Sequence, residues 1–203
     1  MAYAVAALIG YLLGCSNMAR YVAYFKNVDI MHNGSCNPGT ANTVVVIGWW
    51  AGVLVGIHDI GKSVLAALIA WLLFPGVAGV AAVAGAACVI GHIYPVFMKF
   101  AGGKGFAPYI GLMLALDWRF GLVILALVVL ATVVTDYIVV GTTITVLSLP
   151  VYLLIISAGW IAALSAALTS LVIIWKHRQN YVRIWKGTEI GLRSTAKKEH
   201  RVK

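Results

Sequence analysis

Charged residues are scarce in this sequence, and acidic ones most of all. Of its 203 residues, 10% are charged and only six are Asp or Glu, whereas 62% are hydrophobic. A soluble domain carries about 25% charged residues, so the composition excludes an ordinary water-soluble globule. It also excludes a disordered chain, which would be rich in charge and poor in apolar residues. The composition therefore predicts an integral membrane protein.

Cysteine is also scarce, since the chain has only Cys15, Cys36 and Cys88. They are far apart and form no CxxC pair, so we predict neither a disulfide framework nor a metal site. The chain begins MAYAVAALIG, which lacks the positively charged start of a signal peptide. We therefore expect the first helix to be retained.

The basic residues, which give a net charge of +9, gather at one end of the chain. Nine of the 15 follow residue 175: Lys176, Arg178, Arg183, Lys186, Arg193, Lys197, Lys198, Arg201 and Lys203. Such a cluster indicates a cytoplasmic C-terminus and suits contact with anionic lipid headgroups. No nucleic-acid-binding fold or aromatic-basic platform accompanies the charge, so we expect no nucleic-acid partner.

Long apolar runs predict an all-α protein of about seven transmembrane helices. The runs are 2–25, 44–74, 77–98, 106–116, 119–135, 138–157 and 159–175. A helix over the fourth run would be only ~16 Å long, about half the thickness of the hydrocarbon core. This segment could therefore be a half-helix or a re-entrant segment, and the number of transmembrane helices could be as low as five. With the tail inside and seven crossings, the N-terminus lies outside. We expect one membrane domain over 1–175 and a basic cytoplasmic tail over 176–203.

Several polar segments interrupt these runs and are candidates for a site. In Gly102–Gly105, Lys104 stands among three glycines, so successive backbone N–H groups and a cation can converge on a phosphate; a flexible turn is the alternative. The loop 34–43 is rich in hydroxyl and amide donors, although an ordinary turn cluster has the same composition. Asp59 and Lys62 share a helix face inside the membrane, where charges mark functional sites or a structural ion pair.

Two histidines and one misleading motif complete the inventory. His177 and Asn180 share a helix face where the last apolar run ends, and such a face can also be a plain interfacial surface. His92 precedes the glycine-rich loop, and a lone histidine is more often a core residue than a ligand. Residues 56–63 match GxxxxGK[ST], but they lie in an apolar run without the strand that a P-loop needs, which excludes an ATPase.

Taken in order, these segments resemble the bacterial acyl-phosphate:glycerol-3-phosphate acyltransferase family, PlsY, over nearly the whole chain. The matching motifs are Gly34-Ser35-x-Asn37-x-Gly39-x-x-Asn42, Asp59-x-x-Lys62, Gly91-His92-x-x-Pro95-Val96-Phe97-x-x-Phe100-x-Gly102-Gly103-Lys104-Gly105, His177-Arg178-x-Asn180 and Gly187-Thr188-Glu189. The histidine-to-glycine motif is the longest and the most specific of them.

The resemblance implies a multi-pass enzyme of the bacterial plasma (inner) membrane whose active site faces the cytoplasm. It would transfer a fatty acyl group from acyl phosphate to the 1-hydroxyl of glycerol 3-phosphate, giving lysophosphatidate and phosphate. Its partners would be these substrates and membrane lipids, with no cofactor and no metal; the oligomeric state stays open. The HxxxxD mechanism of other acyltransferases is excluded, because no histidine has an aspartate five residues later.

By the same resemblance, each matching position receives an expected role. The expected catalytic residues are Ser35, Lys104 and His177. The expected substrate-binding residues are Gly34, Asn37, Gly39, Asn42, Asp59, Lys62, His92, Gly102, Gly103, Gly105 and Asn180. We expect an acyl-phosphate oxygen to take the hydroxyl proton, with His177 as the protein candidate for the base.

The chain also departs from the family pattern. Cys36 replaces a glycine, Pro38–Ala41 replaces the usual VGAT, Lys176 replaces an arginine and Gln179 a glutamate. Val45 stands where the family has an arginine, and Ala101 where it has a lysine. Two cations are thus missing from a site that must hold two phosphates. The alternatives to an ordinary member of the family are therefore an enzyme that binds the acceptor more weakly, an enzyme with another acceptor, or a non-catalytic membrane paralogue that binds lipid or phosphate ligands.

Overall fold

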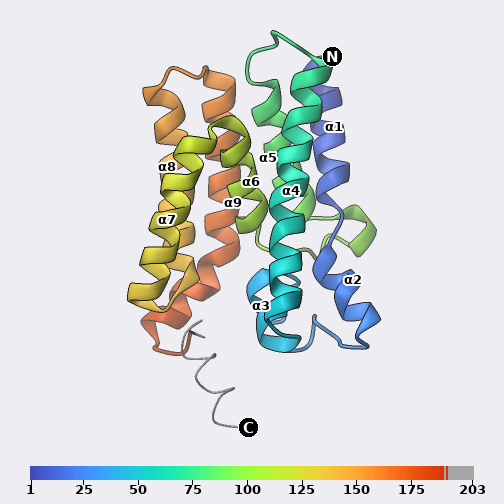
Figure 1. Cartoon of the computed structure of the whole chain (residues 1–203), viewed down its shortest axis with the longest axis vertical. Coiled ribbons are helices and arrows are strands. Elements are labelled where there is room, and N and C mark those ends of the chain that lie inside the picture. Colours follow the sequence, from blue (N-terminus) through green and yellow to red (C-terminus); the bar gives the residue numbers. More distant parts are fainter. Residues whose placement is uncertain (190, 192–203) are drawn as a thin grey trace.

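The computed structural model describes residues 1–189 and 191, and all regular structure in this part of the chain is helical. The elements are α1 (Ala2–Gly14), α2 (Met18–Phe25), α3 (Thr40–Val46), α4 (Trp49–Leu73), α5 (Val80–Ile93), the 3-10 turn η1 (Val96–Met98), α6 (Phe106–Leu116), α7 (Trp118–Thr135), α8 (Ile138–Ile155) and α9 (Trp160–Trp185). They form an upright bundle (Figure 1). The predicted all-α class is confirmed.

Six segments of the described chain are long and apolar enough to cross a membrane. They are Ala2–Phe25, Trp49–Leu73, Val80–Met98, Trp118–Thr135, Ile138–Ile155 and Trp160–Trp185. The seventh expected segment, α6, has 11 residues and rises only ~16 Å. The chain nevertheless runs in opposite directions in α5 and α6 and again in α6 and α7. As a result, the N-terminus and the end of α9 lie at opposite ends of the bundle (Figure 1). The number of full crossings and the orientation in the membrane stay predictions.

The first apolar run is broken into α1 and α2 by polar contacts from distant parts of the chain. The side chain of Asn17 accepts a hydrogen bond from Arg20 N (3.0 Å) and donates one to the carbonyl of Pro38 (3.2 Å). At the end of α1, Lys62 Nζ donates to the carbonyls of Gly14 (3.2 Å) and Ser16 (2.7 Å). A cation at a helix C-terminus stabilises the unpaired carbonyls there. These contacts tie the break to α4 and to the polar loop before α3.

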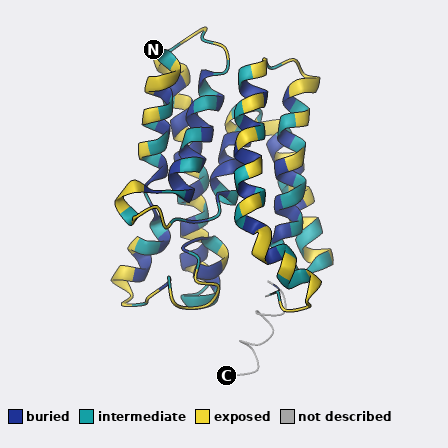
Figure 2. Ribbon diagram, turned by 180° about the vertical axis from the view of Figure 1, so that it is seen from behind, coloured by how far each residue is buried: buried dark blue, intermediate teal, exposed yellow. Residues whose placement is uncertain are grey.

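Small residues let α1 and α5 pack backbone against backbone. A Cβ on Gly14 would collide with the carbonyl of Cys88, and one on Gly91 with the carbonyl of Tyr11. Small residues in membrane helices allow this close approach. α5 also contacts α4, α6 and α9. Buried residues lie on the inner sides of the helices and exposed residues on the outer sides (Figure 2), and many of the exposed residues are large and apolar. The outer surface therefore suits a hydrocarbon environment.

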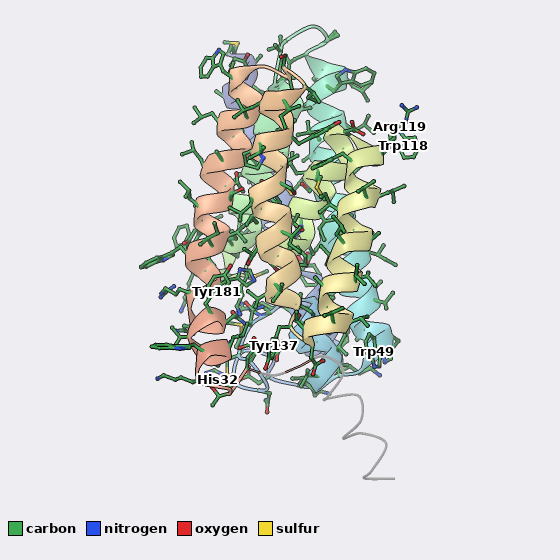
Figure 3. The ribbon with its side chains drawn as sticks, turned by 90° about the vertical axis from the view of Figure 1, so that its left-hand side faces the viewer. His32, Trp49, Trp118, Arg119, Tyr137 and Tyr181 are labelled. Atoms are coloured by element: carbon green, nitrogen blue, oxygen red, sulfur yellow. The ribbon has the colours of Figure 1, made fainter. Side chains whose placement is uncertain are left out.

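The ends of the bundle carry exposed aromatic side chains. Trp49 and Trp118 lie toward opposite ends (Figure 3) and are 50% and 59% exposed, as expected for residues at the two membrane interfaces. α9 continues to Trp185, so residues 176–185 of the predicted tail extend the last helix. The predicted basic residues from Arg193 to Lys203 lie outside the described residues. The division into membrane domain and tail stays a prediction.

Candidate functional site

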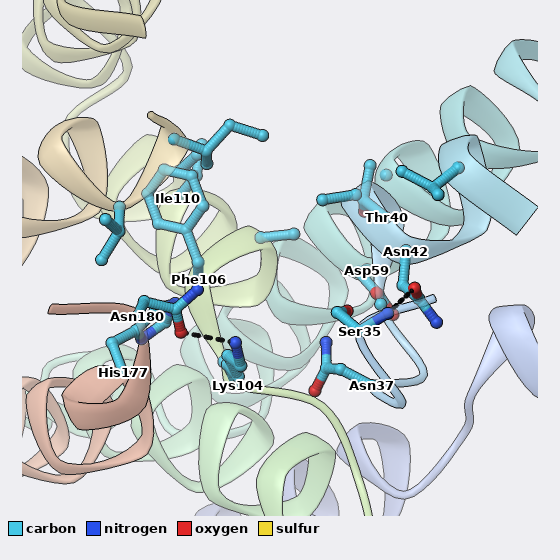
Figure 4. A pocket seen from close by; sticks show the side chains of 18 of the residues that line it. Ser35, Asn37, Thr40, Asn42, Asp59, Lys104, Phe106, Ile110, His177 and Asn180 are labelled. Carbon is cyan, nitrogen blue, oxygen red and sulfur yellow. Dashed lines mark hydrogen bonds between the residues drawn. The ribbon is translucent and has the colours of Figure 1, made fainter. Parts of the chain in front are cut away.

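A cavity of about 290 Å³ lies between two walls of the bundle. One wall consists of the loop before α3, α3 itself and α4, and the other of α6, α8 and α9 (Figure 4). Predicted site residues that line it are Ser35, Asn37, Gly39, Asn42, Asp59, His92, Lys104, Gly105, His177 and Asn180. Gly34, Lys62, Gly102 and Gly103 are not among its lining residues. The folded chain thus brings together residues from four separate sequence motifs.

Lys104 is held at the cavity by a chain of polar contacts. Its Nζ donates to Asn180 Oδ1 (2.6 Å), and Asn180 Nδ2 donates to Glu189 Oε1 (2.5 Å). Glu189 in turn accepts a hydrogen bond from Arg183 Nε (2.6 Å). Burial, and then the positive charge of Arg183, lower the pKa of Lys104 to about 8. An anion beside Nζ would favour its charged form, which is the behaviour expected of a phosphate ligand.

The start of α6 adds unpaired backbone donors next to Lys104. Phe106 and Ala107 are the first residues of this helix and line the cavity. The first N–H groups of a helix have no acceptor within it, and together with the helix dipole they attract anions. The preceding Gly105 has a φ of +88° and lies against Ile93, which is why this sharp turn takes a glycine.

Gly102 and Gly103, the other glycines of the GGKG segment, do not have the role that the sequence predicts for them. Gly102 N donates to the carbonyl of Ile93 (3.2 Å), and Gly103 N donates to that of His92 (3.1 Å). A Cβ on Gly102 or Gly103 would collide with His92. Their N–H groups are therefore engaged within the protein, and the expectation that they converge on a phosphate is corrected. These two glycines let the loop pack directly on His92.

The orientation of His177 leaves one ring nitrogen available. Its Nδ1 lies 2.9 Å from the carbonyl oxygen of Ile173. Since a carbonyl can only accept, Nδ1 carries the proton, and the neutral ring keeps a lone pair on Nε2. The side chain is buried and lines the cavity. Nε2 can therefore accept a hydrogen bond from a substrate hydroxyl.

Asn42 and Gly34 shape the loop that presents Ser35 and Asn37. The Asn42 side chain accepts a hydrogen bond from Ser35 N (2.6 Å) and donates to the carbonyls of Ile30 (3.2 Å) and Asn33 (3.1 Å). Gly34 has a φ of +62°, and a Cβ there would collide with the Asn42 amide. Although Asn42 lines the cavity, its amide is used to hold the loop together.

The predicted pairing of Asp59 with Lys62 is present. Lys62 Nζ lies 2.9 Å from Asp59 Oδ1 and 2.9 Å from His92 Nδ1. The same carboxylate oxygen lies 3.3 Å from His58 Nδ1 and 3.5 Å from His92 Nδ1. Asp59 and His92 reach the cavity, whereas Lys62 turns to the end of α1. Lys62 therefore balances a buried charge and caps a helix.

Other lining residues are not among the predicted site residues. Most are apolar or small: Ala41, Val45, Gly56, Ile60, Phe106, Ala107, Ile110, Ile138 and Val139, with Thr40, Glu189 and Gly191 as further members. Apart from Val45, whose position the resemblance to the family marks, hydrophobic residues of this kind occur in every helix of the chain, so only the fold identifies them. Glu189 belongs to a motif that the sequence does show, without a predicted role.

The two residues that replace the family's cations lie in different places. Val45, at the position of the expected arginine, lines the cavity, whereas Ala101 is exposed and outside its lining. Among the described residues that line the cavity, Lys104 is the only lysine or arginine. Only the change at Val45 therefore alters the charge of the cavity itself.

Comparison with known proteins gives consistent matches. Residues 4–187 match the model of the family described as glycerol-3-phosphate acyltransferase. A glycerol-3-phosphate acyltransferase 1 from Oceanobacillus iheyensis is 34% identical over 96% of this chain and 97% of its own length. A glycerol-3-phosphate acyltransferase from Thermoanaerobacter sp. is 39% identical over 94% and 96%.

Two solved structures have the same fold. Both are crystal structures of PlsY (YgiH), an integral membrane glycerol 3-phosphate acyltransferase, and each is 29% identical to this chain. The glycerol 3-phosphate form has a TM-score of 0.88 over 94% of this chain and 96% of that one. The lysophosphatidic acid form has a TM-score of 0.85 over 94% and 95%.

Proposed function

Because the chain belongs to the glycerol-3-phosphate acyltransferase family, we propose that it transfers a fatty acyl group from acyl phosphate to the 1-hydroxyl of glycerol 3-phosphate. The products are lysophosphatidate and inorganic phosphate. The observation that carries the proposal is the cavity in which Lys104 and the start of α6 lie beside His177. It combines an anion site with an acceptor for a hydroxyl hydrogen.

The donor is already activated, so the protein has to position the hydroxyl and stabilise charge. Lys104 and the first N–H groups of α6 bind phosphate oxygens and stabilise the departing phosphate. The 1-hydroxyl attacks the carbonyl carbon, the new ester C–O bond forms, and the bond from that carbon to the phosphate oxygen breaks. His177 Nε2 accepts the hydrogen bond of the attacking hydroxyl and orients it. The proton ends on the released phosphate, so charge and atoms balance.

The cavity lining suits one amphipathic and one fully polar substrate. Ser35, Asn37 and Lys104 supply polar groups, whereas Ile60, Ile110 and Val139 are apolar. The polar part would hold glycerol 3-phosphate and the phosphate of the donor, and the acyl chain would leave along the apolar residues between the helices. We place the enzyme in the bacterial plasma membrane with this cavity open to the cytoplasm, where glycerol 3-phosphate is dissolved.

A second candidate is a paralogue that binds phosphate-bearing lipids without transferring an acyl group. Val45 favours this second candidate. With a valine at this position, Lys104 supplies the only Lys or Arg charge among the described lining residues. Two bound phosphates would share this charge with the helix N-terminus. Turnover distinguishes the two candidates, since both predict binding.

The test is an assay of the detergent-purified protein with labelled glycerol 3-phosphate. Palmitoyl phosphate and palmitoyl-CoA serve as alternative donors. We expect labelled lysophosphatidate with palmitoyl phosphate and none with palmitoyl-CoA. Product from palmitoyl-CoA alone would overturn the proposed donor, and donor binding without any product would support the paralogue.

A further inference from the structure

Arg183 and Glu189 form an ion pair next to Asn180. Arg183 lies near the end of α9, and its Nε donates to Glu189 Oε2 (2.6 Å). The side chain of Glu189 is only 10% exposed, and a carboxylate that is largely removed from water needs partners for its charge. Arg183 therefore fixes the place of the Glu189 side chain at the edge of the cavity.

Glu189 in turn determines which way the amide of Asn180 faces. A carboxylate only accepts hydrogen bonds, so the amide group of Asn180 that lies 2.5 Å from Glu189 Oε1 is its NH2 group. The amide oxygen then faces Lys104 and accepts a hydrogen bond from its Nζ (2.6 Å; Figure 4). With the amide turned round, two donors would face each other and Lys104 would lose this partner. Glu189 thus keeps an acceptor in front of Lys104.

The charges of the same two residues act on Lys104 with opposite signs. After burial, the positive charge of Arg183 contributes most to lowering the pKa of Lys104, whereas the negative charge of Glu189 raises this pKa and that of Lys176 lowers it. The other titratable residues among the described lining of the cavity are Asp59, His92 and His177. Removal of the charge of Arg183 or of Glu189 should therefore move the pH at which Lys104 loses its proton, in opposite directions.

We propose that Arg183 and Glu189 are positioning residues that hold Lys104 Nζ at the departing phosphate. They act through the amide of Asn180, whose orientation they fix. The inference rests on the proposed function. Arg183 is not among the residues that line the cavity, so it acts without contact with either substrate.

The test is the pH profile of kcat/KM for palmitoyl phosphate in the purified full-length protein. Arg183→Gln should lower kcat/KM near neutral pH roughly tenfold, the loss of about one charged hydrogen bond, and should move the alkaline decrease to higher pH. Glu189→Gln leaves the Asn180 amide free to turn and should also lower kcat/KM, but with the alkaline decrease moved to lower pH. Arg183→Lys keeps the charge and a donor, so it should retain most of the activity.

Lys186→Gln is the matched control. It removes an exposed cation that directly follows α9, and we expect the rate and the pH profile of the wild type. If Arg183→Gln does not fold, the direction of the shift in Glu189→Gln decides the test.

Other results would overturn the inference. A wild-type pH profile in both glutamine variants would do so, as would the same change in Lys186→Gln. Reduced activity with a lower melting temperature and an unmoved alkaline decrease would show that the pair only stabilises the fold.

A wild type that does not turn over palmitoyl phosphate would refute the proposed function instead. The pH dependence of inorganic phosphate binding would then compare the same variants, because the ionisation of phosphate is common to all of them. Shifts in opposite directions would support the effect of the pair on Lys104, and equal profiles would overturn it.

Discussion

At the scale of single residues, the site depends on which atoms the surrounding contacts leave available. His177 Nδ1 is engaged by a backbone carbonyl, so Nε2 is available. The Asn42 amide is used within its loop, although its motif suggests a substrate contact. The side-chain type alone therefore does not distinguish a ligand contact from a structural one.

The pH dependence of donor turnover tests the role of Lys104. Its pKa is lowered to about 8 by burial and by Arg183, so it is charged below this pH and loses its charge as the pH rises. We expect kcat/KM for palmitoyl phosphate to decrease as the pH rises through about 8. Lys104→Arg stays charged over this range and should remove the decrease, as initial rates between about pH 6.5 and 9.5 will show. The same pH profile in both proteins would contradict this role.

Much of the site was predictable from the sequence, for a physical reason. Lys104, His177 and Asp59 are polar residues in or beside apolar runs, where they stand out against hydrophobic neighbours. Ile110 and Val139 also line the cavity, but they do not differ from residues that face lipid. The bonds of Gly102 and Gly103 to the end of α5 depend on the path of the loop, which no local pattern specifies.

At the scale of elements, hydrophobic length predicts the long helices, and tertiary contacts decide their interruptions. α7 and α8 nearly coincide with the apolar runs 119–135 and 138–157. The break between α1 and α2 has no such signal, because the partner of its carbonyls is Lys62 in α4. The separation of α3 from α4 at Gly48, where φ is +120°, also lies inside a predicted run.

Glycine substitutions test the close packing of α1 on α5. Gly14→Val places a side chain against the backbone at Cys88, and we expect a loss of about 3 kcal/mol in the free energy of unfolding. Gly61→Ala is the matched control, since nothing lies within 4 Å of its Cβ position. Alanine also favours the helix by about 1 kcal/mol over glycine, so this variant should be at least as stable as the wild type. Thermal unfolding in detergent measures both, and equal loss in the two variants would refute the packing argument.

At the scale of the whole molecule, the bundle gathers its polar loops and its cavity toward one end. The loop before α3 and the end of α9 lie at the end opposite the N-terminus (Figure 1). Composition predicts the membrane class, and the direction of each helix follows from the order of the runs. The meeting of α3 and α4 with α6 and α9 around one cavity follows only from the packed structure.

The orientation in the membrane can be tested by labelling Cys36. Cys36 is exposed, whereas Cys15 and Cys88 are buried, so the native protein offers one accessible thiol among its described cysteines. A membrane-impermeant maleimide should label it in inverted vesicles, where the cytoplasmic face is outside, and leave it unlabelled in intact spheroplasts. Cys36→Ser is the control and should abolish the label. Labelling in spheroplasts alone would place the cavity on the other side.

The most direct measurement of the central claim is the initial rate of lysophosphatidate formation from palmitoyl phosphate and glycerol 3-phosphate by three purified proteins. The wild type is compared with Lys104→Gln and with Lys99→Gln, which removes an exposed cation outside the cavity lining. We predict activity in the wild type and in Lys99→Gln, and a loss of roughly a hundredfold or more in Lys104→Gln, because a charge at the departing phosphate is removed. Equal rates in the two variants, or no product from the folded wild type, would contradict the account.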